Sequence, residues 1–176
     1  SHAVAYAIGS YYAAWLHTHH EKTWLATILQ SENSNPKGLQ KAISEIKQMG
    51  YKFAAADINY SGDEWIYSAE RSAFVPPLTS VKGVGVNAVQ EIMIRRPYSS
   101  LYNLLYDEDG VWKHSKMNKT CFSALCKIEA FNSLEELTTG AISNHKQMHD
   151  IIIDNYEILR KSAYGMTMRK AQKSGA

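Results

Sequence analysis

The fold of this chain is decided by one stretch, Leu78-Thr-Ser-Val-Lys-Gly83-Val84-Gly85-Val86-Asn87-Ala88-Val-Gln-Glu-Ile92. Gly83 and Gly85 allow the backbone to turn sharply and leave no Cβ between it and a ligand. We expect Val84 to anchor this turn in the core and Ala88 to let two helices approach closely. The stretch therefore predicts a short helix, a glycine turn and a second helix.

The same turn predicts a binding site for phosphate. Backbone amides around Gly83–Val86 would point outward at the N-terminus of the second helix, where the helix dipole favours negative charge. The predicted contacts are Lys82, Gly83, Val84, Gly85, Val86 and Asn87. Such contacts hold the backbone of a duplex without reading its sequence. A lone Gly-x-Gly is common in tight turns, but the whole stretch is typical of a helix-hairpin-helix; a purely structural hairpin is the alternative.

The residues before Pro76-Pro77 predict three helices and a small β element. Apolar spacing of three and four residues predicts two helices within residues 1–30, with a break near His19–Glu21. A third helix is expected over Leu39–Met49, ended by Gly50. Three connecting segments follow from composition: a polar turn over Ser31–Gly38, a short strand over Tyr51–Phe53, and a mostly acidic connector over residues 57–70 in which a small sheet is expected.

Downstream of the prolines the pattern is again helical. The expected helices are Val86–Arg95, Tyr98–Leu105, Asn118–Ala130 and Ala141–Leu159. The fold class is therefore mainly α with a small β element. We divide the chain into residues 1–75, a duplex-binding unit with a tandem-like hairpin at 76–132, a C-terminal helix at 133–160, and a frayed basic tail at 161–176.

Composition limits the classes of function. Of the 176 residues 45% are hydrophobic and 20% are charged, which excludes a disordered chain. No apolar run approaches the length of about 18–20 residues that spans a bilayer, so no membrane partner is expected. Cys121 and Cys126 form neither a CxxC pair nor a disulfide framework, which indicates a reducing, cytoplasmic setting.

Other candidate sites are weaker. His17, His19, His20 and Glu21 are spaced so that they do not converge on one point of a helix, and no metal site is predicted there. Asp57 and Asp63 lack the third group that metal or acid–base chemistry needs. No nucleophile–base pair and no phosphate loop of the P-loop type is visible. We therefore expect no catalytic residue and no cofactor bound by this chain.

Several segments in one order resemble the bacterial DNA polymerase III alpha subunit, the C family of replicative polymerases. Ser1-His-Ala-Val-Ala-Tyr-Ala7 with Trp15-Leu16 resembles its SHAAAYA…AWL segment, and Asp57-Ile-Asn59 its PDIN segment. Val81-Lys-Gly-Val-Gly85 resembles its IKGVG segment. Tyr98–Leu104 and Asn118–Phe131 resemble two further segments, so that the resemblance covers residues 1 to about 132.

The resemblance implies a place within a polymerase. Residues 1–30 would end the fingers, with Ser1 and His2 near the phosphates of the incoming nucleotide. Residues 76–132 would grip the primer–template duplex, with Lys119 as a further DNA contact. The catalytic aspartates and their Mg²⁺ would lie in a palm that precedes Ser1. The upstream palm and fingers are thus an expected partner; a sliding clamp is left open, since no short clamp-binding motif stands out.

Three positions depart from the family pattern. Ala56 replaces a proline, Glu129 a glycine and Asn132 an aspartate. This divergence indicates a phage or otherwise distant member. Two readings of the function remain: a noncatalytic piece of a replicative DNA polymerase, which is favoured because Ser1–Leu16 carries bulky apolar residues, and a freestanding helix-hairpin-helix DNA-binding protein.

Overall fold

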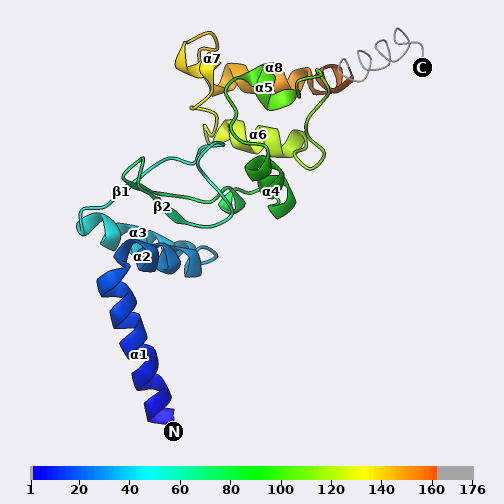
Figure 1. Ribbon diagram of the computed structural model, residues 1–176. Coiled ribbons are helices and arrows are strands. Elements are labelled where there is room, and N and C mark those ends of the chain that lie inside the picture. Colours follow the sequence, from blue (N-terminus) through cyan, green and yellow to red (C-terminus); the bar gives the residue numbers. More distant parts are fainter. Residues whose placement is uncertain (1, 162–176) are drawn as a thin grey trace. The chain divides into compact units, whose positions relative to one another are not determined.

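The computed structural model describes residues 2–161, and the predicted basic tail lies almost entirely outside this range. The chain forms two compact units. One contains residues 1–54 and 64–76, and the other contains residues 55–63 and 77–176. As the sequence predicts, the described residues are mainly helical, with one small sheet (Figure 1).

The first unit begins with three helices: α1 (His2–His19), α2 (Glu21–Ser31) and α3 (Pro36–Gln48). The expected break between the first two helices is confirmed at His20. The third helix begins earlier than predicted, because Asn35 caps it by accepting a hydrogen bond from the amide of Gly38. Pro36 at its first position lacks only an amide that would have no partner inside the helix. A proline that suggested a turn in the sequence therefore starts a helix.

A three-stranded sheet follows the three helices in the chain. Its strands are β1 (Lys52–Phe53), β2 (Ile66–Ser68) and β3 (Ala73–Val75), in the order β1-β3-β2. β1 is parallel to the central strand and β2 is antiparallel to it. The core of this unit consists of Leu25, Ala26, Leu29, Ala42, Ile46, Trp65 and Phe74. Helix faces thus pack against the sheet through Trp65 and Phe74.

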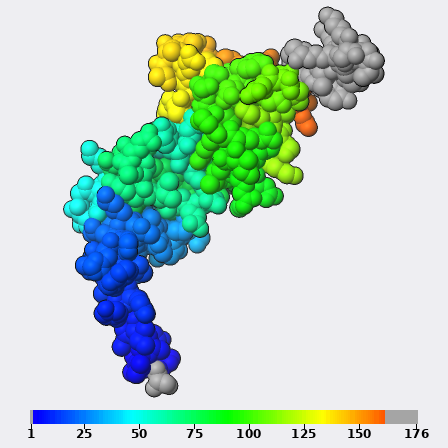
Figure 2. Space-filling model, viewed as in Figure 1, coloured from blue at the N-terminus to red at the C-terminus, as the bar shows by residue number. Residues whose placement is uncertain are grey.

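Helix α1 differs from the rest of its unit because none of its residues is buried. Its surface, drawn in blue, is open along the length of the helix (Figure 2). It contains no Asp, Glu, Lys or Arg. Large apolar side chains remain exposed, namely Val4, Tyr6, Ile8, Tyr11, Tyr12, Trp15 and Leu16. An apolar helix face of this size is normally covered by another surface.

The second unit consists of short helices. They are a 3₁₀ turn η1 (Leu78–Ser80), α4 (Val86–Ile94), α5 (Leu101–Leu105), α6 (Lys119–Lys127), α7 (Glu135–Thr138) and α8 (His145–Asp154). Three of them start later than predicted because a side chain caps each first turn: Ser100 caps α5, Asn118 caps α6 and Asn144 caps α8. The four-residue helix α7 was not predicted.

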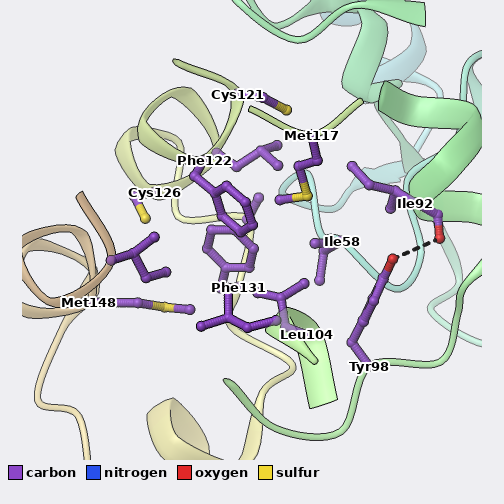
Figure 3. Close-up of a cluster of buried hydrophobic side chains, with 14 of the residues drawn as sticks. Ile58, Ile92, Tyr98, Leu104, Met117, Cys121, Phe122, Cys126, Phe131 and Met148 are labelled. Carbon is purple, nitrogen blue, oxygen red and sulfur yellow. Dashed lines mark hydrogen bonds between the residues drawn. The ribbon is translucent and has the colours of Figure 1, made fainter. Parts of the chain in front are cut away.

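One apolar core joins all of these helices. Phe122 from α6 and Phe131 from the segment after it lie at the centre, with Ile58, Leu104 and Met148 around them (Figure 3). α8 packs along α6. The residues expected to form a separate C-terminal helix therefore bury Met148, Ile152 and Tyr156 in the same core as the glycine turn.

Residues 55–63 belong to the second unit through polar contacts. The Asn59 side chain accepts a hydrogen bond from the Tyr98 amide and donates to the Tyr98 carbonyl, both at 2.8 Å. The Arg96 guanidinium donates to the carbonyls of Ile58 and Ser61. Asp57, which the sequence offers as one of a carboxylate pair, is buried and accepts from the Ser133 hydroxyl at 2.9 Å. These contacts give the Asp-Ile-Asn segment a structural role in the second unit.

Candidate nucleic-acid interface

The glycine turn connects η1 to α4, as the sequence predicts, but its two glycines differ in backbone conformation and in surroundings. Gly83 has a φ of 97°, which lies in the left-handed region that residues with a Cβ rarely adopt. A Cβ there would lie 3.4 Å from Thr120 Cγ2 and 3.5 Å from the Cβ of Ala124. Both distances are ordinary van der Waals contacts, so Gly83 is required by its backbone conformation and not by lack of space beside α6.

Gly85 does not need a glycine conformation, which corrects the expectation that both glycines make the sharp turn. Its φ is −82° and its ψ 155°, an extended conformation open to any residue, and a Cβ there would meet nothing within 4 Å. Gly85 is the N-cap of α4. What glycine provides at this position is free space in front of the first turn of the helix.

This free space belongs to an open pocket of about 280 Å³. It is lined by Gly83, Gly85, Val86, Asn87, Ala88, Lys116, Asn118 and Cys121. In α4 the amides of Ala88 and Val89 bond to the Gly85 carbonyl, whereas the first two amides of a helix have no partner inside it. The amides of Val86 and Asn87 thus stand at the positive end of α4, beside the pocket.

The N-terminus of α6 reaches the same pocket. Asn118 caps this helix by accepting a hydrogen bond from the Cys121 amide at 3.0 Å, and both residues line the pocket. Lys116 precedes this cap by two residues and is exposed. The pocket is therefore lined by the starts of two helices and by one lysine, which is a suitable environment for an oxygen anion such as a phosphate.

A buried carboxylate holds the loop before α6. Glu91 of α4 accepts four hydrogen bonds: from the amides of Ser115, Lys116 and Met117 at 2.8, 2.9 and 3.0 Å, and from the Ser115 hydroxyl at 3.0 Å. Burial by itself would raise the pKa of Glu91, but the hydrogen bonds from these three residues outweigh it and lower the pKa to about 2. Glu91 is therefore ionised at neutral pH and fixes the loop.

The predicted contacts divide into two groups. Gly83, Gly85, Val86 and Asn87 line the pocket together, whereas Val84 is buried in the core as the anchor of the turn. Lys82 is exposed beside Gly83 and does not line the pocket. Lys119 is the exposed first residue of α6. Lys116 takes the position by the pocket that the sequence analysis gave to Lys82.

The predicted nucleotide contacts lie elsewhere. Ser1 is outside the described residues, and His2 opens α1 as an exposed side chain whose ring meets Tyr6 edge to face at 4.8 Å. Lys116 and Glu91 were missed by the sequence analysis. The sequence did predict a helix that starts at Asn118 and a DNA contact at Lys119. It could not show that this helix start adjoins the start of α4, because no sequence pattern says which helix termini meet in space.

The predicted tandem hairpin changes character after α6. This helix ends at Lys127, and Glu129 follows with a φ of 60°, a left-handed conformation that favours glycine. Ala130 and Phe131 then enter the core. The expected helix over Asn118–Ala130 is thus shorter at its C-terminal end, where the chain turns at Glu129.

Within residues 2–161, no group of three or more His, Cys, Asp or Glu side chains could hold a metal ion. Nor does any helix in the part of the chain that the structure describes have the length and apolar character needed to cross a bilayer.

Two helices joined by a tight glycine turn, with free amides at the start of the second, define a helix-hairpin-helix protein. A family model described as the helix-hairpin-helix motif matches residues 50–139, which is more than half of the chain. The chain therefore belongs to the helix-hairpin-helix motif family. The match includes both helix starts that line the pocket.

Relatives of the chain are polymerase subunits. It is 26% identical to the DNA polymerase III subunit alpha of Pasteurella multocida over 98% of its length, and 31% identical to that of Chlamydia muridarum over 85%. It is 35% identical to the Thermotoga maritima subunit over 63% of its length. The chain spans only 16%, 12% and 13% of these relatives. The resemblance noted in the sequence to this polymerase family is thus confirmed.

Proposed function

We propose that the chain is part of a replicative DNA polymerase, a DNA-directed nucleotidyltransferase, in which it binds the backbone of the primer–template duplex. The observation that carries this proposal is the pocket where α4 and α6 begin, which is lined by Val86 and Asn87, whose amides open α4, and by Lys116, which can supply an ammonium group. These groups recognise a phosphate oxygen and do not distinguish bases. Lys82 and Lys119, exposed beside the two helix starts, supply further charge for neighbouring phosphates.

The apolar face of α1 supports a second part of the proposal. In the assembled polymerase this helix packs against the fingers and palm, which cover its exposed tyrosines and Trp15. Ser1 and His2 would then stand near the triphosphate of the incoming nucleotide. A cytoplasmic location and contact with the upstream segments of the polymerase follow from the same assignment.

The chemistry of nucleotide addition falls to other segments of the polymerase. Two-metal phosphoryl transfer needs carboxylates that hold both ions, and residues 2–161 contain no group of that kind. No step of the reaction is therefore assigned to a side chain of residues 2–161. Its own contribution is to hold the duplex and, through His2, to touch nucleotide phosphate.

Duplex binding tests the proposal directly. A fluorescein-labelled duplex is titrated with the 176-residue chain, with anisotropy as the readout. We expect binding in the micromolar range or weaker at physiological salt, because few phosphates are engaged. Lys82→Ala and Lys116→Ala should each weaken binding and reduce the slope of log Kd against log salt by about one. Duplexes of unrelated sequence should bind equally well.

Gly85→Val provides the sharpest variant for this titration. Its backbone conformation suits valine, so the fold should persist while the side chain fills the pocket and blocks phosphate. Lys41→Ala, which removes an exposed lysine of α3, is the matched control and should leave affinity nearly unchanged. If the single variants Lys116→Ala and Gly85→Val both bound duplex with wild-type affinity, this pocket would not be the duplex-binding site.

A further inference from the structure

Glu91 ties α4 to the loop that carries Lys116. On α4 it follows Asn87 and Ala88 by four and three residues, so the three side chains share one side of the helix. Its two oxygens gather the amides of three consecutive residues, 115 to 117, at distances from 2.8 to 3.0 Å. The carboxylate therefore acts on the side of α4 that adjoins the pocket.

The loop has no regular structure of its own. Residues 115–118 lie between an isolated β-bridge at Trp112 and the start of α6. Ser115 and Lys116 are exposed, whereas Met117 is buried in the core. Backbone amides need partners when strand and helix bonds are lacking. Here the Glu91 carboxylate supplies that partner for three residues in succession.

We propose that Glu91 is a positioning residue for duplex binding, which holds the Lys116 ammonium beside the first turn of α4 so that both can meet the same phosphate. The inference rests on the proposed function, since it requires that the pocket accepts a phosphate. Glu91 itself touches no ligand. It acts by fixing in advance a lysine whose loop would otherwise have to be ordered when the duplex binds.

The charge of Glu91 is compatible with an anion nearby. Glu91 is 9% exposed, whereas Lys116 is exposed to solvent. The four hydrogen-bond donors of residues 115–117 point towards the Glu91 carboxylate, and the Arg95 guanidinium lies 3.7 Å from Glu91 Oε1. The negative charge is thus compensated within the fold by these hydrogen bonds and by Arg95.

A double-mutant cycle on the 176-residue chain separates positioning from general stability. Lys116→Ala should weaken binding to the labelled duplex about three- to fivefold and lower the salt slope by about one. Glu91→Gln keeps the shape but cannot satisfy four donors, and it should cause a similar loss and the same change in slope. The double variant should bind no more weakly than Lys116→Ala alone. Glu108→Gln, in an exposed turn, is the matched control.

Three results would overturn the inference. In the first, circular dichroism shows that Glu91→Gln is folded, and the variant binds duplex with the affinity and the salt slope of the wild type. The losses of the two single variants could also multiply in the double variant, which would show that Glu91 acts independently of Lys116. If Glu91→Gln does not fold, hydrogen exchange of the wild type decides: the amides of residues 115–117 should be protected before duplex is added, and protection that appears only with duplex refutes prior positioning.

Failure of the proposed function gives a different pattern. In that case Lys116→Ala and Gly85→Val bind duplex as the wild type does, whatever Glu91→Gln shows. A wrong inference with a correct function leaves those two variants impaired and Glu91→Gln unaffected.

Discussion

At the scale of single residues, the two glycines of the turn make separable contributions to folding and to binding. Gly83 has a left-handed backbone and contacts α6, whereas Gly85 is extended and faces open space. The spacing in the sequence predicted both glycines but could not assign these roles, because φ is set by how the turn meets α6. Substitutions at these two positions should therefore change the free energy of unfolding by different amounts.

Gly83→Ala should lower the free energy of unfolding by about 1–2 kcal/mol, since the left-handed region penalises a Cβ. Gly85→Ala should change it by only a few tenths of a kcal/mol to about 1 kcal/mol, the usual range for an N-cap substitution. Urea denaturation followed by circular dichroism measures both. Equal destabilisation by the two variants would contradict the division of roles.

Glu129 offers a stabilising substitution. Its φ of 60° strains a residue with a side chain, so Glu129→Gly should raise the free energy of unfolding by about 1 kcal/mol. Lys127→Gly, two residues earlier and still within α6, is the opposing control: it should lower the same quantity by about 1 kcal/mol. A loss of stability in Glu129→Gly would mean that the carboxylate contributes more than its backbone strain costs.

Glu91 should make the free energy of unfolding depend on pH in the acidic range. Its pKa is lowered to about 2 in the folded chain, so the unfolded chain binds the proton more readily as the pH falls. The ionised group should contribute about 3 kcal/mol above about pH 5, and this contribution should disappear as the pH falls towards about 2. The difference in unfolding free energy between wild type and Glu91→Gln, measured in urea at several pH values, should shrink accordingly. A difference that stays constant from neutral pH down to about pH 2 would contradict this assignment.

At the scale of elements, helix starts and ends were predicted less well than the helices themselves. Apolar spacing located α1, α2, α4 and α6 because each buries or presents a periodic face. Asn35, Ser100 and Asn144 moved other boundaries, since a capping side chain acts through local hydrogen bonds that apolar spacing does not register. The four-residue α7 is too short to show any period.

The exposed face of α1 should make the chain associate with itself. Tyr6 and Tyr11 are 68% and 67% exposed on a helix without charged residues of the Asp, Glu, Lys or Arg types. Sedimentation velocity should therefore detect oligomers that grow with concentration. The double substitution Tyr11→Lys/Trp15→Lys should restore a monomer. Tyr102→Lys, at another exposed tyrosine outside α1, is the control and should leave the association unchanged.

At the scale of the whole molecule, the sequence predicted the fold class and the glycine hairpin but not the binding pocket. The hairpin is encoded in consecutive residues, from Leu78 to Ile92. The pocket is not, because Lys116 and Asn118 reach it from a loop about thirty positions later, and only the packing of α6 against Gly83 brings them there. Pairings between distant segments have no local pattern from which to predict them.

Primer extension tests the assignment of the whole molecule. The 176-residue chain alone should extend no primer at any magnesium or manganese concentration, because residues 2–161 contain no group of carboxylates for two metal ions. Joined to the palm and fingers of a related polymerase, it should support nucleotide addition. In that assembly His2→Ala should raise the apparent KM for nucleotides or lower kcat without changing duplex affinity. Extension by the chain alone would refute the assignment.

The contribution of residues 55–63 to the second unit limits how genes can recombine here. In the sequence, Pro76-Pro77 marks an apparent boundary at which a DNA-binding module could be separated by recombination. That module, however, also includes the nine residues 55–63, which precede strands β2 and β3 in the chain. A crossover at the prolines would inherit Arg96 without the carbonyls of Ile58 and Ser61, and would leave the place of Ile58 in the core empty. The hairpin is therefore expected to be inherited together with the segment that precedes it, and to resist shuffling as a separate exon-like piece.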